Sequence, residues 1–136
     1  MNIVIDTNIL ISALIKEGTI RSIITNFSFN LLFPELEFRE LENHREELLK
    51  KSKLSEKEFN ILLLYLLKYI KVIKTEKIIT YQKEAKNIMK TIDPDDAMFI
   101  ATAIAFNAII WSDDKHFKMQ ERIKVLNTKE IIQSLC

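Results

Sequence analysis

The sequence predicts an α/β fold in which a short parallel sheet is covered by helices on both faces. Short apolar runs rich in β-branched residues alternate with longer segments of helical apolar spacing, a pattern typical of such folds. The 136 residues include one Gly and two Pro, so few turn-forming residues that most of the chain is expected to be helical. These two observations favour a largely helical protein built around a small sheet.

Five short apolar runs are the predicted strands. Residues 3–5 are three consecutive β-branched residues, which favours a strand buried on both faces. The other four runs are residues 30–33, 71–73, 108–111 and 123–126. In a parallel sheet the carboxyl ends of such strands meet at one edge, which is the usual ligand position in open α/β sheets.

The segments between the strands are predicted helices. Residues 8–16 are expected to form a short helix that starts with Thr7 or Asn8 as cap and closes at Gly18. Residues 34–51 are expected to form one long helix with Pro34 in its first turn. The remaining predicted helices cover residues 20–27, residues 81–90 with Thr80 as cap, residues 97–106, and a terminal helix capped by Thr128.

Ser55 and Glu58 form a predicted capping box for a further helix. This helix is apolar nearly all round over residues 61–67, so we expect it in the core or in a subunit interface. The same run is far too short to cross a membrane, and the first residues do not resemble a signal peptide. We therefore expect a cytoplasmic protein with no membrane partner.

The bulk composition predicts one globular domain over residues 1–136. Hydrophobic residues make up 48% and charged residues 29% of the chain, which is ordinary for a soluble globular protein. The formal charge of +1, from 20 basic and 19 acidic residues, excludes a strongly basic surface overall but allows a local basic rim. The single Cys136 cannot form an internal disulfide.

Acidic residues gather where predicted strands end. Asp6 follows the first strand, and the pair Asp113 and Asp114 follows the strand at residues 108–111. A third group, Asp93, Asp95 and Asp96, precedes the helix that leads into that strand. Carboxylates brought together in this way repel one another unless a divalent cation neutralises them. Oxygen ligands select Mg²⁺ or Mn²⁺, so the pattern predicts metal-assisted phosphodiester hydrolysis.

Each acidic group also has a simpler interpretation. Asp6 could pair with a cation or cap the following helix, and Asp95 or Asp96 could be helix caps. Asp113 and Asp114 could form an ordinary polar turn after a strand. The shared position of these groups at one sheet edge is what favours the metal site.

Three segments of the chain resemble the acidic motifs of PIN-domain nucleases. The opening Ile-Val-Ile-Asp6-Thr-Asn-Ile-Leu is similar to the first motif of that family. The segment Asp96-Ala-Met-Phe-Ile-Ala-Thr-Ala resembles the third motif, and Trp-Ser112-Asp-Asp114 resembles the fourth. Pro-Glu-Leu-Glu-Phe-Arg-Glu40-Leu resembles the segment that carries the second, a helical Glu. The resemblance covers essentially the whole chain.

This resemblance implies a PIN-like, Rossmann-like three-layer α/β/α sandwich and cleavage of RNA, single-stranded or structured, with Mg²⁺ or Mn²⁺. Many small relatives are VapC-type toxins that an antitoxin protein inhibits and that form homodimers. The implied catalytic and metal-binding residues are Asp6, Glu40, Asp96 and Asp114. The assignment of Glu40 is the least specific of the four, because Glu35, Glu37 and Glu42 lie on the same segment.

Four further residues are expected around this quartet. Asn8 and Ser112 would orient the carboxylates or the attacking water, although simple capping explains either residue equally well. The choice between Asp113 and Asp114 depends on the register of the strand, and Asp93 is either a fifth acidic group or part of the helix start.

Two basic segments have both a functional and a simpler interpretation. Lys115 and His116 follow the last acidic turn and are placed to meet an RNA phosphate, or they lie on the surface. His44 shares a helix face with Glu40, which could line a cleft, but an exposed histidine on a solvated face is the preferred interpretation.

Other functions fit the sequence less well. A haloacid-dehalogenase-type phosphatase needs a second Asp where this chain has Asn8. A receiver domain has its acidic pair near the amino terminus, whereas the pair here lies near the carboxyl end. A PIN-like module that binds RNA or protein without cutting it, and a housekeeping RNA-processing nuclease, are the remaining alternatives.

Overall fold

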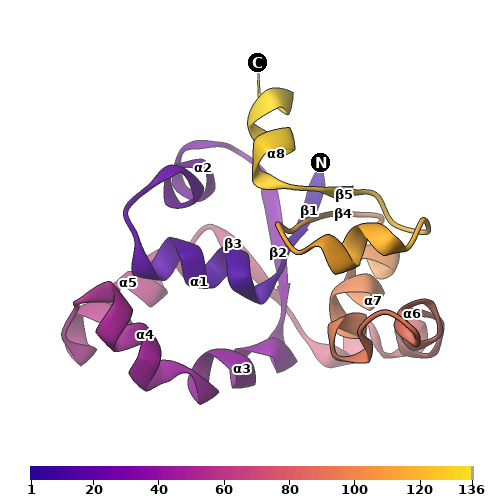
Figure 1. Ribbon diagram of the computed structural model, residues 1–136, viewed down its shortest axis with the longest axis horizontal. Coiled ribbons are helices and arrows are strands. Elements are labelled where there is room, and N and C mark those ends of the chain that lie inside the picture. Colours follow the sequence, from indigo (N-terminus) through magenta and orange to yellow (C-terminus); the bar gives the residue numbers. More distant parts are fainter. Residues whose placement is uncertain (136) are drawn as a thin grey trace.

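The computed structural model describes residues 1–135 and contains a five-stranded parallel sheet (Figure 1). The strand order is β3-β2-β1-β4-β5, and all four pairings are parallel. The predicted α/β class and all five strand positions are therefore confirmed. The strands are β1 (Asn2–Ile5), β2 (Asn30–Pro34), β3 (Ile70–Ile73), β4 (Ile109–Trp111) and β5 (Val125–Leu126). Cys136, expected to form no internal disulfide, lies outside the described residues.

The central strand β1 sets the position of the site. Its residue Val4 aligns with Leu32 of β2 and with Ile110 of β4, and all three side chains are fully buried. Apolar residues on both faces of β1 are possible because helices cover both faces. The next pair in the register is Ile5 of β1 and Trp111 of β4. The carboxyl ends of these two strands therefore lie side by side at one edge of the sheet.

The helices form the two outer layers (Figure 1). On one side α7 packs against β1, β2 and β4, and α6 packs on α7. On the other side α1 contacts α2, α3, α4 and α5. The helices are α1 (Thr7–Ile15), α2 (Thr19–Asn26), α3 (Phe38–Asn43), α4 (Arg45–Ser52), α5 (Glu56–Leu67), α6 (Gln82–Met89), α7 (Ala97–Ala105) and α8 (Thr128–Ser134). Within residues 1–135, no helix has both the length and the apolar character that a membrane span needs.

The long helix expected over residues 34–51 is wrong. Pro34 ends β2, a 3₁₀ turn η1 (Glu35–Glu37) follows, and the helix breaks at His44 between α3 and α4. His44 has φ −106° and ψ 12°, outside helical geometry. The change of direction lets both α3 and α4 contact α1, so tertiary packing overrides a continuous helical pattern.

Two predicted helix boundaries near the amino terminus and in the middle of the chain have different outcomes. Gly18 does not close α1, which ends at Ile15 with Lys16 as its C-cap; it is instead the residue before α2, with an extended backbone. The capping box of Ser55 and Glu58 is confirmed, because each residue accepts a hydrogen bond from the backbone N–H of the other, at 3.1 and 3.0 Å. A reciprocal side-chain pair is thus a stronger boundary signal than a lone glycine.

Two other predicted caps are displaced along the chain. Thr80 lies inside a 3₁₀ turn, η3 (Ile79–Tyr81), and α6 begins only after Tyr81. The cap of α8 is Asn127, whose side chain accepts the Glu130 N–H at 2.8 Å, and Thr128 is the first helical residue. Both errors are of one or two residues, as expected for helix ends.

The helix α5 buries only part of its apolar surface. Phe59 and Leu66 are buried, but Ile61 is 58% and Leu64 is 65% exposed. The prediction that this helix is buried is therefore wrong for its outer face. The alternative prediction, a subunit interface, stays a prediction.

Candidate metal centre

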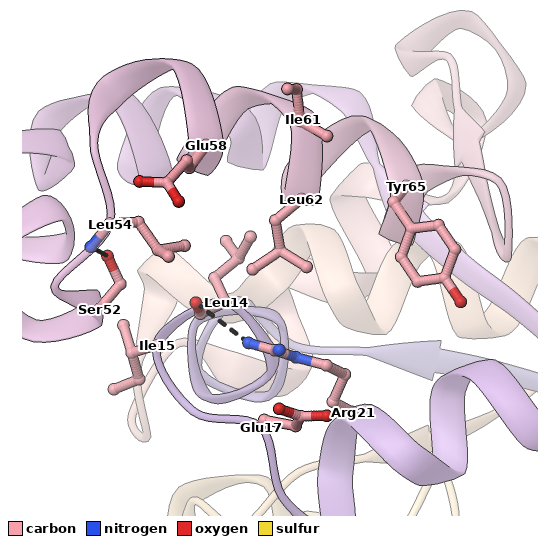
Figure 2. A pocket seen from close by; sticks show the side chains of 10 residues that line it. All are labelled: Leu14, Ile15, Glu17, Arg21, Ser52, Leu54, Glu58, Ile61, Leu62 and Tyr65. Atoms are coloured by element: carbon pink, nitrogen blue, oxygen red, sulfur yellow. Dashed lines mark hydrogen bonds between the residues drawn. The ribbon is translucent and has the colours of Figure 1, made fainter.

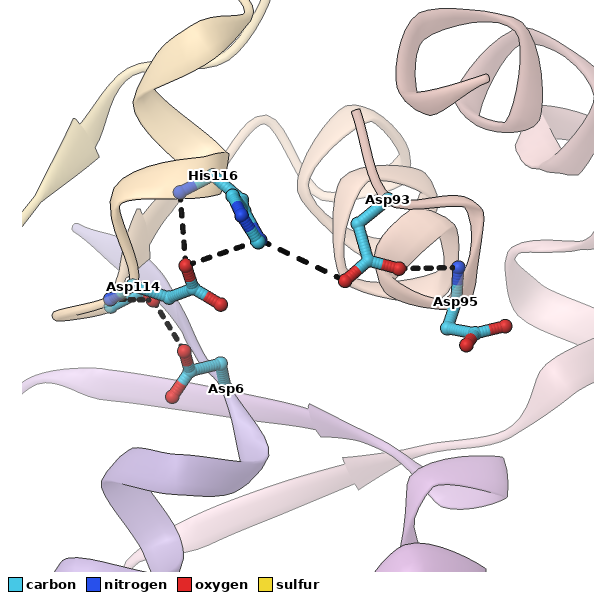
Figure 3. A network of polar contacts seen from close by, with 6 residues as sticks. Asp6, Asp93, Asp95, Asp114 and His116 are labelled. Carbon is cyan, nitrogen blue, oxygen red and sulfur yellow. Dashed lines mark hydrogen bonds and ion pairs between the residues drawn. The ribbon is translucent and has the colours of Figure 1, made fainter. Parts of the chain in front are cut away.

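The ends of β1 and β4 bring acidic residues from opposite ends of the sequence together. The backbone N–H of Asp6 donates to the Trp111 carbonyl at 3.3 Å, so Asp6 lies beside the turn that begins at Ser112. The third acidic group enters from the 3₁₀ turn η4 (Pro94–Asp96), which leads into α7. Figure 3 shows Asp6, Asp93 and Asp114 around one small volume.

Asp6 is buried and held from two sides. Its carboxylate caps α1 by accepting the Ile9 N–H at 2.9 Å, and it also accepts a hydrogen bond from the Ser112 hydroxyl. The expected caps Thr7 and Asn8 are therefore wrong, because Asp6 itself is the cap. One carboxylate oxygen accepts the hydrogen bond from the helix, and the other accepts the one from Ser112. Helix capping and a position at the edge of the acidic cluster are therefore compatible for Asp6.

The surroundings of Asp6 disfavour its charge. Burial raises the pKa of Asp6 to about 6, although the hydrogen bonds from Ser112 and Ile9 act in the opposite direction. The negative charges of Asp114 and Asp113 raise it further. No cationic partner of Asp6 occurs among residues 1–135, so the ion-pair explanation of this residue has no support in the structure.

Asp96 has the most acidic surroundings of the cluster. Burial raises its pKa to about 7, and the charges of Asp93, Asp114, Asp6 and Glu37 raise it in that order. The structure thus places the predicted residues Asp6, Asp96 and Asp114 within electrostatic reach of one another.

Glu37, and not Glu40 alone, is the glutamate of the segment after β2 that lies near this cluster. Burial raises the pKa of Glu37 to about 7, followed by the charges of Glu40 and Asp95 and by a hydrogen bond shared with Glu40. Glu37 is half-buried whereas Glu40 is exposed, and the charge of Glu37 acts on Asp96. The three-residue spacing of the two glutamates in the sequence indicates that both lie on one helical face. This spacing does not distinguish which of them approaches the cluster.

The two aspartates after β4 face different ways. Asp114 accepts the His116 N–H at 2.9 Å, and its own N–H donates to the Ser112 hydroxyl at 3.0 Å. Asp113 accepts two hydrogen bonds from Thr128, at 2.7 Å from its N–H and 2.7 Å from its hydroxyl. The Asp114 side chain therefore points toward the cluster. The Asp113 side chain connects the segment after β4 to the first residue of α8.

The remaining predicted residues lie at the margin or outside. Asp93 caps η4 by accepting the Asp95 N–H at 3.2 Å and also reaches His116, so it belongs to both the helix start and the cluster. Asn8 and Lys115 are exposed. His44 pairs with Glu47 at 3.5 Å on an exposed face, as expected for a solvated histidine.

The sequence places His116 after the last acidic turn but did not reveal its contact with Asp93. Its Nδ1 atom lies 3.5 Å from Asp114 Oδ1 and 3.8 Å from Asp93 Oδ2 (Figure 3). Ligand atoms of Asp93, Asp96 and His116 all lie within 4.8 Å of one another. The position of His116 depends on the 3₁₀ turn η5 (Lys115–Met119) after Asp114. No periodicity in the sequence predicts this turn.

These donors fit a divalent cation. The oxygen-rich set that Mg²⁺ and Mn²⁺ prefer is present, and burial, followed by the charges of neighbouring carboxylates, raises the pKa values of Asp6, Asp96 and Glu37. A positive ion would remove the cause of the mutual repulsion.

Two hollows lie on the surface, one distant from this cluster and one that reaches it. An apolar hollow of about 520 Å³ lies beside α1 and α5 and is lined by Leu14, Leu62 and Tyr65 among others (Figure 2). It contains none of the acidic residues of the cluster. The second hollow follows α6 and ends at the turn η4, with Lys83, Lys86, Lys90, Pro94 and Asp95 in its lining.

Comparisons with known proteins agree with the fold. The family model of the PIN domain matches residues 4–136, and no curated protein matches the chain. A chain of the crystal structure of VapBC2 from Rickettsia felis, bound to a DNA fragment from their promoter, is similar over 93% of this chain and 98% of that chain, with 21% identity and a TM-score of 0.69. At this identity the likeness shows a common fold. Because the family model covers nearly the whole sequence, the chain belongs to the PIN domain family, whose members are nucleases.

Proposed function

We propose that this protein is a metal-dependent endoribonuclease that hydrolyses phosphodiester bonds of RNA, and that it acts in the cytoplasm as the toxin of a toxin–antitoxin pair. The observation that carries the proposal is the meeting of Asp6, Asp96, Asp114 and Glu37 at the carboxyl edge of the sheet, with no cation among residues 1–135 that neutralises Asp6 or Asp96. A purely structural cluster of this kind would only cost folding free energy.

In this proposal Asp6, Asp96 and Asp114 bind the cation, and the glutamate pair Glu37 and Glu40 completes the set. A divalent ion bound there would supply charge stabilisation at the phosphate oxygens and activation of water. Ser112 positions the carboxylate of Asp6 and the backbone of Asp114. The hydrogen bond from the Ile9 N–H helps to orient the Asp6 carboxylate. The chain thus provides a set of oxygen donors in fixed positions.

The hollow along α6, here called the lysine hollow, supports the proposal that the substrate is a polyanion. Lys83, Lys86 and Lys90 are spaced by three and four residues, so they lie on one face of α6 and just after it. None of the three forms an ion pair with another residue in the part of the chain that the structure describes. Because this hollow ends at Pro94 and Asp95, an RNA strand lying in it would run directly into the acidic cluster.

The proposed protein partners are inferred from the apolar surface beside α1 and α5. The hollow beside α1 is lined by Leu14, Ile15 and Leu62, and it continues onto the exposed residues Ile61 and Tyr65 of α5 (Figure 2). Exposed apolar surface that is continuous in this way is typical of protein interfaces. We propose that an antitoxin protein covers the hollow together with the exposed face of α5 beside it, since the fold is similar to that of a chain in the VapBC2 structure, and that the protein forms a homodimer through another surface.

Cleavage of an unstructured RNA oligonucleotide tests the nuclease. We expect cleavage with Mg²⁺ or Mn²⁺ that EDTA abolishes and that is reduced to background in Asp6→Asn. The matched control Glu46→Gln removes an exposed acidic charge on α4 and should cut like the wild type. Cleavage by Asp6→Asn at the wild-type rate would show the metal site to be wrong. No cleavage by any form, with RNA still bound, would favour a silent RNA-binding module.

Expression in a bacterial host tests the toxin role. We expect growth arrest from the wild-type chain but not from Asp6→Asn, and relief when the small gene adjacent to its own is co-expressed. A nuclease that cuts RNA in vitro without arresting growth would be a housekeeping enzyme.

A further inference from the structure

Within residues 1–135, His116 is the one side chain at the acidic cluster that can offer an imidazole nitrogen as a ligand. Its imidazole reaches the cluster from the turn η5, with Nδ1 facing both Asp114 and Asp93 (Figure 3). The side chain is 52% exposed, so its packing in the core does not account for this orientation. The backbone N–H of His116 is already bound to Asp114, which holds the residue at the start of the turn.

The donor atoms at His116 lie slightly farther apart than the ligands of a single bound ion. Donor atoms of Asp93, Asp96 and His116 lie within 4.8 Å of one another. Two ligands of the same small divalent ion lie at most about 4.4 Å apart, because each bond is about 2.2 Å long. Binding one ion would require these donors to approach one another by about 0.4 Å, and His116 is the exposed member of the three.

We propose that His116, together with Asp93 and Asp96, binds a divalent transition-metal ion through an imidazole nitrogen and thereby makes the centre prefer Mn²⁺ to Mg²⁺. Imidazole is a ligand for transition ions, whereas Mg²⁺ takes oxygen ligands almost exclusively. This inference rests on the proposed cation site and adds a ligand that carboxylates alone would not provide. It also makes Asp96 the carboxylate shared between His116 and the Asp6 side of the cluster.

A simple ion pair is the competing explanation of the same contacts. In an ion pair the imidazole is protonated and bridges Asp93 and Asp114, whereas a metal ligand must be neutral with a free lone pair. The two explanations therefore differ in whether the nitrogen contacts the ion, which spectroscopy can measure directly.

The chain contains two histidines, and His44 is a matched control. It is 49% exposed, pairs with Glu47 on a different helix, and lies outside the acidic cluster. The experiment loads the RNA-free chain of 136 residues with Mn²⁺ and records electron spin-echo envelope modulation from imidazole nitrogen. The variants are His116→Gln and His44→Gln. Calorimetric titration with Mn²⁺ and with Mg²⁺ gives the two affinities for each form.

We expect nitrogen modulation in the wild type and in His44→Gln, and none in His116→Gln. The Mn²⁺ dissociation constant should rise on the order of ten-fold in His116→Gln, while that for Mg²⁺ changes by less than about two-fold, since imidazole contributes little to Mg²⁺ binding. Absence of nitrogen modulation in the wild type, or equal losses for the two ions, would overturn the inference.

RNA cleavage is measured separately, so the two proposals can fail independently. A protein that cuts RNA with Mg²⁺ but shows no nitrogen modulation keeps its nuclease function and loses this inference. A protein that binds Mn²⁺ through His116 but cuts no RNA loses only the nuclease function.

Discussion

The Ser112 hydroxyl donates a hydrogen bond to the buried carboxylate of Asp6 and joins two residues that are 106 positions apart in the sequence. The same hydroxyl oxygen accepts the Asp114 N–H at 3.0 Å. One small side chain therefore fixes the relative positions of the two strand-end aspartates. Parallel pairing of β1 with β4 makes this contact possible, because it aligns Ile5 with Trp111.

Replacing Ser112 with Ala should raise the pKa of Asp6 above its value of about 6. The hydrogen bond from Ser112 stabilises the charged carboxylate, so its loss favours the protonated form. A pH titration of the Asp6 carboxyl carbon by NMR in metal-free protein measures the change. Ser28→Ala, at an exposed serine, is the control and should leave the titration unchanged. An unaltered Asp6 titration in Ser112→Ala would refute this role.

Substitutions of Asp6 should separate capping from metal binding. Asn retains the oxygen that accepts the Ile9 N–H and removes a buried charge, so Asp6→Asn should be at least as stable as the metal-free wild type at pH 8. Asp6→Ala loses the cap and should have a free energy of unfolding lower by about 1 kcal/mol. Urea denaturation in EDTA measures both. Equal destabilisation of the two variants would contradict the capping role.

The metal-free protein should become less stable as the pH rises. The pKa values of Asp6, Asp96 and Glu37 are raised to about 6, 7 and 7. Above the ordinary carboxyl pKa values of 3.8 and 4.5 the unfolded chain has released these protons while the folded chain still holds them, so folding loses free energy as the pH rises.

The melting temperature in EDTA should therefore fall between about pH 5 and pH 8. Addition of Mn²⁺ at pH 8 should reverse the fall, because the ion binds the ionised carboxylates of the folded state. A melting temperature that rises over this range in EDTA would be inconsistent with the clustered carboxylates.

Glu37 and Glu40 should act as a pair. Removing the charge of Glu40 in Glu40→Gln should lower the pKa of Glu37, because the charge of Glu40 and the hydrogen bond shared with it both raise that pKa. Each of Glu37→Gln and Glu40→Gln should weaken Mn²⁺ binding on the order of ten-fold. Glu42→Gln, at an exposed residue that pairs with Arg45, is the control. A loss confined to one of the pair would identify that residue as the sole ligand of the segment.

The three lysines of the hollow should contribute to RNA binding through charge. Combined substitution of Lys83, Lys86 and Lys90 by Gln should reduce the slope of log affinity against log salt by about 2, since each contact of a lysine with a single-strand phosphate contributes about 0.7. Binding is measured with Asp6→Asn as background to prevent cleavage.

The control removes three exposed lysines near α5, namely Lys57, Lys68 and Lys71. Their substitution changes the net charge equally but should leave the salt dependence unchanged. Equal effects of the two triple variants would indicate a general charge effect and no specific surface.

The sequence by itself determined the sheet and the two strand-end aspartates. A run such as residues 3–5 is apolar on both faces and has to lie inside a covered parallel sheet, which places Asp6 at the strand's carboxyl end. The same reasoning places an acidic pair after Trp111. Local signals with two reciprocal parts, such as Ser55 with Glu58, also determined a helix start correctly.

Only the tertiary structure decided which neighbouring side chains face the cluster. Asp114 turns toward Asp6 while Asp113 binds Thr128, a choice made by the turn that follows β4. The break at His44 and the approach of Glu37 to Asp96 depend on packing against α1 and α7. His116, in η5, lies beside Asp93 at the start of η4. Spacing along the chain carries no information on these directions, because side-chain contacts between distant segments depend on packing that no local pattern specifies.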